Sequence, residues 1–254
     1  MLAYANERTL PQHTAQLESE LALLAELIGL LQMHRGASLA ALGGAAGFQQ
    51  KVEELQPTID QLIARLSYGS SQADPALWQL IQSEWRNTRK HWRKDNPLNN
   101  FEIHSFLIEN CHRMLWHQLK PRVASCAHTW ALLKELAEHT ECIAQLRGLV
   151  SYGMTNHNNP SSTIDVQDRI VQLNRQSQCG LIDTQQKLIK LSSQQSTPIP
   201  ALRARIQLTG QFLQAVQAYI NTRQGPPADT TFHLGTLAIE ANQRVWQILL
   251  SIEH

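Results

Sequence analysis

The chain has 254 residues, with 22 Lys and Arg against 21 Asp and Glu, and a formal net charge of +1. A chain of this length can bury a sizeable core in one or two domains. The near-neutral charge argues against a non-specific binder of polyanions. Composition and charge therefore indicate an ordinary soluble protein and point to no partner.

The sequence also bears on the cellular compartment. The longest apolar run, residues 22–31, is half the length of a membrane span and is interrupted by Glu26, so no transmembrane helix is expected. No apolar run follows Glu7 and Arg8, so no export signal is expected either. We therefore expect a cytoplasmic protein with free thiols. Its cysteines form no CxxC pair: Cys111, Cys126, Cys142 and Cys179.

Apolar residues recur at the helical period through almost the whole chain, which predicts an all-α protein. Gly43 and Gly44 are expected to end a first helix, Pro57 to bend the second, and Asp74 to cap the third. Pro121 could kink a helix or begin a new one. The expected segments are 10–42, 46–67, one starting after Asp74, and an apolar pattern from 101 to 152.

The second half continues in the same way. A loop is expected at 155–163, then a polar helix to about 195, a helix over 200–224, and a last helix capped by Thr230. Eight segments split four and four predict two antiparallel four-helix bundles that share long helices. We expect one domain built from two halves, about 10–120 and 121–254, without a separate output domain.

Arg35 interrupts the apolar face of the first helix. Steps of three and four residues place it on the stripe formed by Leu24, Ile28, Leu31, Ser38 and Leu42. A buried guanidinium without a partner costs several kcal/mol, so an opposite charge must face it. That charge could belong to an acidic side chain of the protein or to an external anion.

Arg147 repeats this pattern in the second half, on a seam that also holds Ile143 and Val150. Gly36 follows the first arginine and Gly148 follows the second, and glycine lets another helix or a ligand approach the backbone closely. The two segments therefore predict related roles for the two arginines.

Two motifs resemble those of a known family. The stretch "LLQMHRGASLAALGGAAGF", with Phe48 at its end, resembles the first signature of the NIT domain, the nitrate- and nitrite-sensing module of bacterial regulators. The stretch "CIAQLRGLVSYG" resembles the second signature. The resemblance implies two four-helix bundles that bind nitrate or nitrite between them through arginines of both halves.

The resemblance also implies particular binding residues. Arg35 matches the second arginine of a pair in the first motif, and His34 stands where the other arginine often lies. A protonated histidine there would make binding depend on pH. Arg147 matches the arginine of the second motif. A further arginine of the family matches Arg203 or Arg205 by spacing, and this choice stays open, with Arg244 a weaker match.

The chemistry of the ligand agrees with these residues. Nitrate is planar with three equivalent acceptor oxygens, which suits the planar fork of arginine better than the point charge of lysine. Ser38, one turn from Arg35, could donate one more hydrogen bond. Because no output domain is expected, the signal should pass to a separate regulatory protein, and homodimer formation is left open.

The main alternative is a helical interaction protein that binds RNA through the basic stretch 86–94, near Trp85 and Trp92, with both arginines structural. A solvated helix face is the simpler interpretation of that stretch, so nucleic acid is not the expected partner. Glu109 and His112 form a single ExxH motif, and a di-iron site needs two, so no metal or other cofactor is expected. No nucleophile or phosphate-loop motif is present, and we do not expect an enzyme.

Overall fold

The computed structural model describes residues 10–67, 74–123, 127–156, 163–195, 201–223 and 225–252, and within these ranges every regular element is a helix. The all-α prediction is confirmed. The helices are α1 (Leu10–Leu42), α2 (Ala46–Leu66), α3 (Pro75–His91), α4 (Pro97–Val123), α5 (Ala127–Thr155), α6 (Thr163–Gln195), α7 (Ala201–Thr222) and α8 (Ala228–Ile252).

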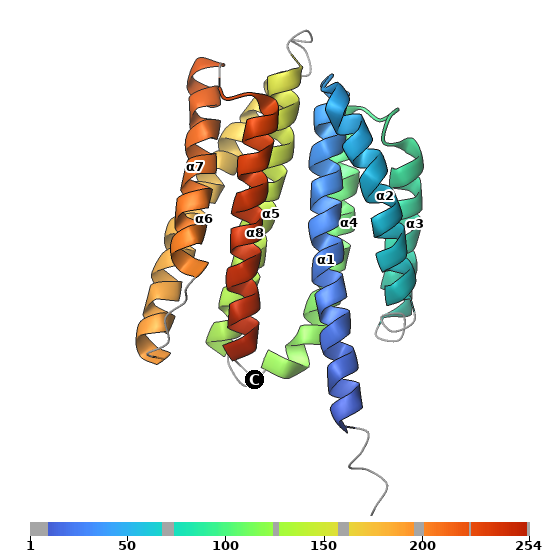
Figure 1. Ribbon diagram of the computed structural model, residues 1–254, viewed down its shortest axis with the longest axis vertical. Coiled ribbons are helices and arrows are strands. Elements are labelled where there is room, and N and C mark those ends of the chain that lie inside the picture. Colours follow the sequence, from blue (N-terminus) through green and yellow to red (C-terminus); the bar gives the residue numbers. More distant parts are fainter. Residues whose placement is uncertain are drawn as a thin grey trace, which may run out of the picture.

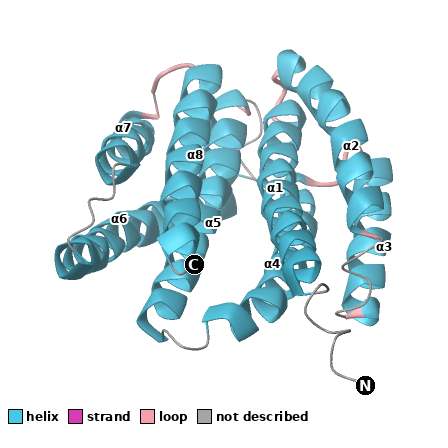
Figure 2. Cartoon of the chain, turned by 60° about the horizontal axis from the view of Figure 1, so that its bottom comes forward, coloured by secondary structure: helices cyan, strands magenta, loops and turns pink. Residues whose placement is uncertain are grey.

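The helices gather in two groups, with α1–α4 on one side and α5–α8 on the other (Figure 1). Helix α1 packs against α2, α4 and α5, and α5 packs against α6, α8 and α1. Helix α3 covers α4, and α7 covers α6 and α8. Turning the molecule shows α1 and α4 next to α5 and α8 at its centre, with the other helices outside (Figure 2). The α1–α5 contact therefore joins the two halves.

The apolar core continues across this contact. Leu39 of α1 and Phe101 of α4 are fully buried in the same cluster as residues of α5, α6, α7 and α8. A separate cluster fills the first half and includes Trp78 and Trp85 of α3. The two halves therefore share a continuous apolar core.

Several helix ends agree with their local chemistry. Helix α1 ends at Leu42, and Gly44 has a φ of 105°, a conformation that glycine adopts without strain. The Asp74 carboxylate accepts a hydrogen bond of 3.0 Å from the backbone N–H of Leu77, which confirms it as the N-cap of α3.

Other ends differ from the prediction. Thr230 is not the cap of α8, because the helix already begins at Ala228, and the N–H of Thr231 bonds to the carbonyl of Pro227. Helix α4 continues past Pro121 to Val123, so this proline does not begin a new helix. Pro57 lies inside α2. Most of the loop expected at 155–163 lies outside the described residues.

Among the described helices, none is long and apolar enough to cross a membrane. Cys111, Cys142 and Cys179 are free thiols, and Cys126 lies outside the described residues.

Candidate functional site

The site begins where α1 and α5 touch through two glycines. A Cβ added to Gly148 would lie 3.4 Å from the Cα of Gly36 and 2.9 Å from a methyl carbon of Leu39. Only residues without a side chain allow this approach. It places Arg35 and Arg147, each one residue before its glycine, at the junction of the two halves.

Arg35 is fully buried and faces a carboxylate of the other half. Its Nη1 donates to Oε1 of Glu141 at 2.6 Å and to the hydroxyl of Ser105 at 3.0 Å. Its guanidinium carbon lies 5.5 Å from the centre of the Phe101 ring. Its Nε and Nη2 are buried and have no hydrogen-bond partner among the described residues.

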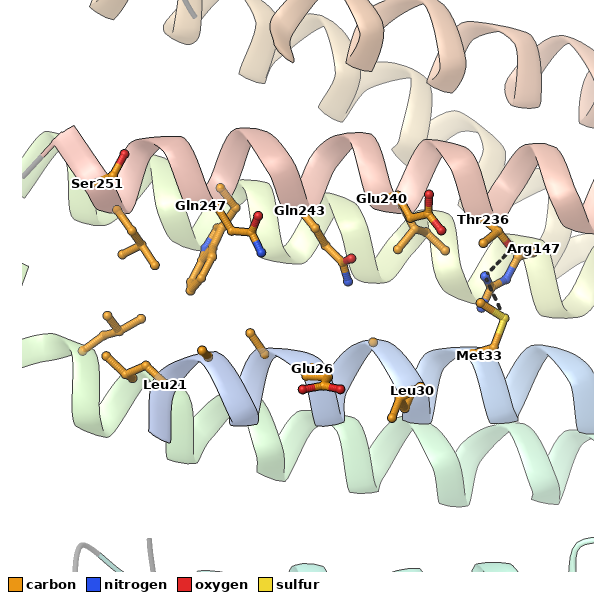
Figure 3. Close-up of a pocket in the computed structure, with 17 residues that line it drawn as sticks. Leu21, Glu26, Leu30, Met33, Arg147, Thr236, Glu240, Gln243, Gln247 and Ser251 are labelled. Carbon is orange, nitrogen blue, oxygen red and sulfur yellow. Dashed lines mark hydrogen bonds between the residues drawn. The ribbon is translucent and has the colours of Figure 1, made fainter. Parts of the chain in front are cut away.

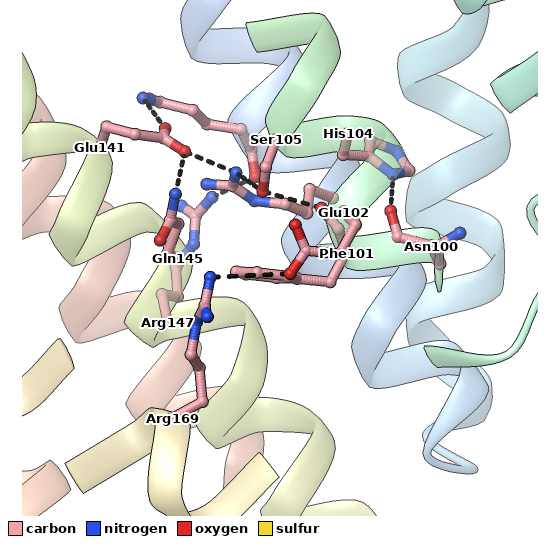
Figure 4. Close-up of polar contacts among 11 residues, drawn as sticks. Asn100, Phe101, Glu102, His104, Ser105, Glu141, Gln145, Arg147 and Arg169 are labelled. Atoms are coloured by element: carbon pink, nitrogen blue, oxygen red, sulfur yellow. Dashed lines mark hydrogen bonds and ion pairs between the residues drawn. The ribbon is translucent and has the colours of Figure 1, made fainter. Parts of the chain in front are cut away.

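Glu141 is held ionised by its neighbours. Burial alone would raise its pKa, but the charge of Arg35 and the hydrogen bond from it outweigh burial, and the pKa lies below its ordinary value. The carboxylate also accepts 2.9 Å bonds from the side-chain amides of Gln32 and Gln145. Figure 4 shows Glu141 and Gln145 beside Arg147 and facing Ser105 of α4.

Arg147 is equally buried, but none of its hydrogen bonds within the described structure goes to a carboxylate. Its Nη1 donates to the hydroxyl of Thr236 at 2.9 Å and lies 3.8 Å from the sulfur of Met33. Its Nη2 donates to the backbone carbonyl of Gln32 at 2.8 Å, and its guanidinium lies 4.6 Å from the centre of the Phe232 ring. Its Nε is buried without a partner among these residues.

The electrostatics of Arg147 reflect this environment. Burial, and then the nearby charge of Arg35, lower its pKa to about 9 against the opposing effects of Glu141 and Glu240. The guanidinium is therefore still a cation at neutral pH. Glu240 lies on an exposed part of α8, so the buried junction holds two guanidinium groups and one carboxylate. An additional negative charge would be stabilised there.

A pocket of about 880 Å³ opens beside Arg147, between α1 and α8 (Figure 3). Arg147, Thr236 and Met33 lie together at one end of it, and Glu26 and Glu240 lie on its walls. The indole N–H of Trp246 also belongs to this pocket and has no partner among the described residues. The pocket is thus mainly apolar with a buried cation at one end.

His34 does not lie at this junction. It is buried in the first half, where it contacts His104 and packs edge-on against Trp85. Nδ1 of His104 is 2.7 Å from the carbonyl of Asn100 and must donate to it, so Nε2 of His104 accepts from Nδ1 of His34 at 2.8 Å. Burial, then the neighbouring His104, hold the pKa of His34 well below its ordinary value. The protonated histidine of the sequence hypothesis is disfavoured here.

Ser38 is buried beside Arg35, but its hydroxyl already has partners. The hydroxyl donates to the side-chain oxygen of Asn100 at 2.8 Å, and it also lies 3.0 Å from the backbone carbonyl oxygen of Arg35.

The other two candidate arginines do not reach the junction: Arg203 is exposed on α7, and Arg244 is exposed on α8.

Arg205 is buried in a separate network of the second half. Its Nε donates to Oδ1 of Asn242 at 2.7 Å, and its Nη2 donates to Nδ1 of His139 at 3.0 Å and to the hydroxyl of Thr184. His139 precedes Arg147 by eight residues of α5, roughly 12 Å of helix rise. Of the two arginines between which the spacing could not choose, Arg205 is the buried one, yet it does not join Arg35 and Arg147.

Sequence reasoning missed the groups that support the arginines. Phe101 and Ser105 on α4 face Arg35, and Phe232 and Thr236 on α8 face Arg147. In each pair the hydroxyl also bonds to the carbonyl of the phenylalanine four residues earlier, at 2.8 Å and 2.9 Å. The repeated Phe-x-x-x-Ser/Thr spacing was a signal that could have found them. Glu141, which faces the other half, had no such local signal.

The basic stretch 86–94 has the features of a solvated helix face. Arg89 pairs with Asp60 at 2.7 Å, and Arg93 pairs with Glu53, so α2 neutralises two of its charges. The rings of Trp85 and Trp92 are buried and cannot stack on bases in this arrangement.

Over the described ranges, no three histidine, cysteine or acidic side chains converge as they would around a metal ion.

The fold and site define an all-helical protein with a buried pair of arginines at the junction of two helical halves. Comparison of the chain with family models, with curated proteins and with solved structures finds no match. The NIT resemblance therefore still depends on the two motifs that carry Arg35 and Arg147.

Proposed function

We propose that the protein is a sensor that binds nitrate or nitrite between its two helical halves and passes the signal to a separate protein. The observation that carries the proposal is the buried junction itself, where two guanidinium groups, one from α1 and one from α5, lie near a single carboxylate, Glu141, which pairs with Arg35. Such a junction stabilises one further negative charge. The nature of the anion comes from the resemblance of the two arginine motifs to NIT signatures.

The geometry favours a planar oxyanion over a spherical one. At the arginine junction, Nε and Nη2 of Arg35 and Nε of Arg147 are buried donors that have no partner among the described residues. Each charge-assisted hydrogen bond contributes about 1.5 to 3 kcal/mol, and three of them suffice for roughly micromolar binding after desolvation. An arginine fork bonds two oxygens of a planar anion at once, which chloride cannot match.

The position of the junction also suits signalling. An anion bound there would contact both halves, so it would favour whichever relative packing of α1 and α5 places both guanidinium groups best. The readout would be a change of that packing, recognised by a regulatory protein. The RNA-binding alternative has less support, because its tryptophans are buried and two of its basic residues are paired.

Calorimetric titration of the purified protein with nitrate, nitrite, chloride and sulfate tests the proposal. We expect one site that binds nitrate or nitrite at least about tenfold more tightly than chloride. Arg147→Lys keeps the charge but removes the fork, so it should weaken nitrate binding strongly. Arg89→Lys changes an exposed arginine on α3 and should leave the affinity unchanged. Equally weak heats for all four anions would end the sensor proposal.

A further inference from the structure

The two halves present the same arrangement of residues around their arginines. Arg35 contacts Ser105 and Phe101 of α4, and Arg147 contacts Thr236 and Phe232 of α8. Helices α1 and α5 approach closely at Gly36 and Gly148, and each arginine also bonds to the other half, Arg35 to Glu141 and Arg147 to the backbone carbonyl of Gln32. The surroundings of the two arginines are therefore similar.

The similarity fails at two pairs of corresponding positions. The interval that separates Arg35 from Arg147 also separates Gly29 from Glu141 and Met33 from Gln145. Glu141 binds Arg35 directly, and Gln145 donates to Glu141 at 2.9 Å. On the opposite side Met33 lies 3.8 Å from Arg147, and the place equivalent to Glu141 is held by glycine.

Gly29 also lies on the wall of the pocket that ends at Arg147. A Cβ at this position would meet only the end of the Gln243 side chain, at 3.1 Å, and that amide is itself part of the pocket wall. A glycine in a helix interior lowers helix stability by about 1 kcal/mol relative to alanine, and neither a turn nor a helix crossing requires one at this point of α1. Its effect here is to keep a side chain out of the pocket that ends at Arg147.

We propose that Gly29 is the residue that determines anion binding: the ligand's negative group takes, at Arg147, the place that the Glu141 carboxylate takes at Arg35. This inference rests on the proposed function and deepens it. It assigns one anion per chain, bonded to Arg147 and reached through the pocket between α1 and α8. The ligand class is a planar oxyanion, either an inorganic one such as nitrate or a carboxylate, because Glu141 shows that a carboxylate fits the equivalent place.

The test adds a tethered carboxylate. Gly29→Glu should place a carboxylate against Arg147 as Glu141 is placed against Arg35, and Gly29→Gln is the neutral control of nearly equal shape. We expect Gly29→Glu to melt several degrees above Gly29→Gln at pH 7. This difference in melting temperature should disappear when each of the two variants also carries Arg147→Met. The comparison isolates the interaction of residue 29 with Arg147. Equal melting with Arg147 present would overturn the inference.

The same variants test ligand binding, with nitrate and acetate as the two anions titrated. We expect Gly29→Glu to bind whichever anion the parent protein binds at least about tenfold more weakly than Gly29→Gln does. If the parent protein binds one of the anions and Gly29→Glu binds it as tightly as Gly29→Gln does, the inference is overturned but the proposed function stands. A parent that binds neither anion would overturn the proposed function itself. The nitrate and acetate titrations separate an inorganic ligand from a carboxylate.

Discussion

The guanidinium of Arg147 fills the space that a side chain on Gly36 would need. A Cβ on Gly36 would lie 3.2 Å from Nε of Arg147 and 3.0 Å from the ring of Phe232. The glycine of one half is thus a condition for burying the arginine of the other. Substitution at this glycine should therefore disturb the junction.

We expect Gly36→Ala to destabilise the protein, because Phe232 and Arg147 must shift, which typically costs about 1 to 3 kcal/mol. Gly210→Ala is the matched control, since its Cβ would meet nothing within 4 Å inside α7 and alanine favours the helix by up to about 1 kcal/mol. Urea unfolding should place Gly36→Ala below the parent and Gly210→Ala at or above it. Equal stability of the two variants would show that the crossing tolerates a methyl group.

Arg35→Met and Arg147→Met should differ in their effect on folding. Removing Arg35 leaves the carboxylate of Glu141, which is only 16 % exposed, without its cation. We therefore expect the free energy of unfolding to fall by about 3 kcal/mol or more. Arg147 pairs with no carboxylate in the described structure, so its replacement by an apolar side chain should change stability by less than about 1 kcal/mol or increase it. Chemical denaturation of both variants measures the difference.

The double variant Arg35→Met with Glu141→Gln is the control for the Arg35–Glu141 ion pair. The double variant removes the isolated charge and should recover much of the lost stability. A double variant no more stable than Arg35→Met alone would mean that Arg35 contributes through packing on Phe101 and not through its charge.

Acidification should destabilise the protein before its carboxylates titrate. Burial lowers the pKa of His104 and of His139 from 6.5 to about 4. The folded state then binds fewer protons than the unfolded state between these values, so stability is full above pH 6.5 and falls as the pH drops toward 4. Glu141, whose pKa is also lowered, adds a further loss below its ordinary value of 4.5. Melting temperatures measured from pH 7.5 to pH 4 test this expected decrease in stability.

His104→Asn should make this pH dependence shallower, because asparagine can still donate to the Asn100 carbonyl but does not titrate. The variant's stability at pH 7 can change for other reasons, so the slope is the quantity to compare. An unchanged slope would mean that His104 is not among the groups responsible.

Arg205→Lys should leave the anion affinity unchanged, although it alters a fully buried arginine of the second half. Arg205 bonds to His139 and Asn242, in a network away from Arg147. Calorimetry with nitrate on this variant distinguishes the two arginines. A drop comparable to that of Arg147→Lys would place Arg205 in the binding site.

Periodicity predicted most of the fold, because the helices are long and their apolar stripes regular; α1 has the bounds expected for it. Arg35 and Arg147 could be identified as buried because each lies on such a stripe. Which charge faces Arg35 could not be predicted, since Glu141 lies on another helix in the other half and has no fixed spacing from it. His34 was misleading for a related reason: one residue along a helix turns a side chain by about 100°, away from the junction.

The similar surroundings of the two arginines have a consequence for assembly. In a dimer of two identical four-helix chains, any residue at the place of Gly29 would occur at both equivalent places, so both arginines would have a glutamate or both would face a glycine. With the two halves in one chain, Glu141 can neutralise Arg35 while Gly29 puts no side chain into the pocket that ends at Arg147. One arginine then has a carboxylate partner while the other faces an open pocket, an asymmetry that two identical chains could not provide.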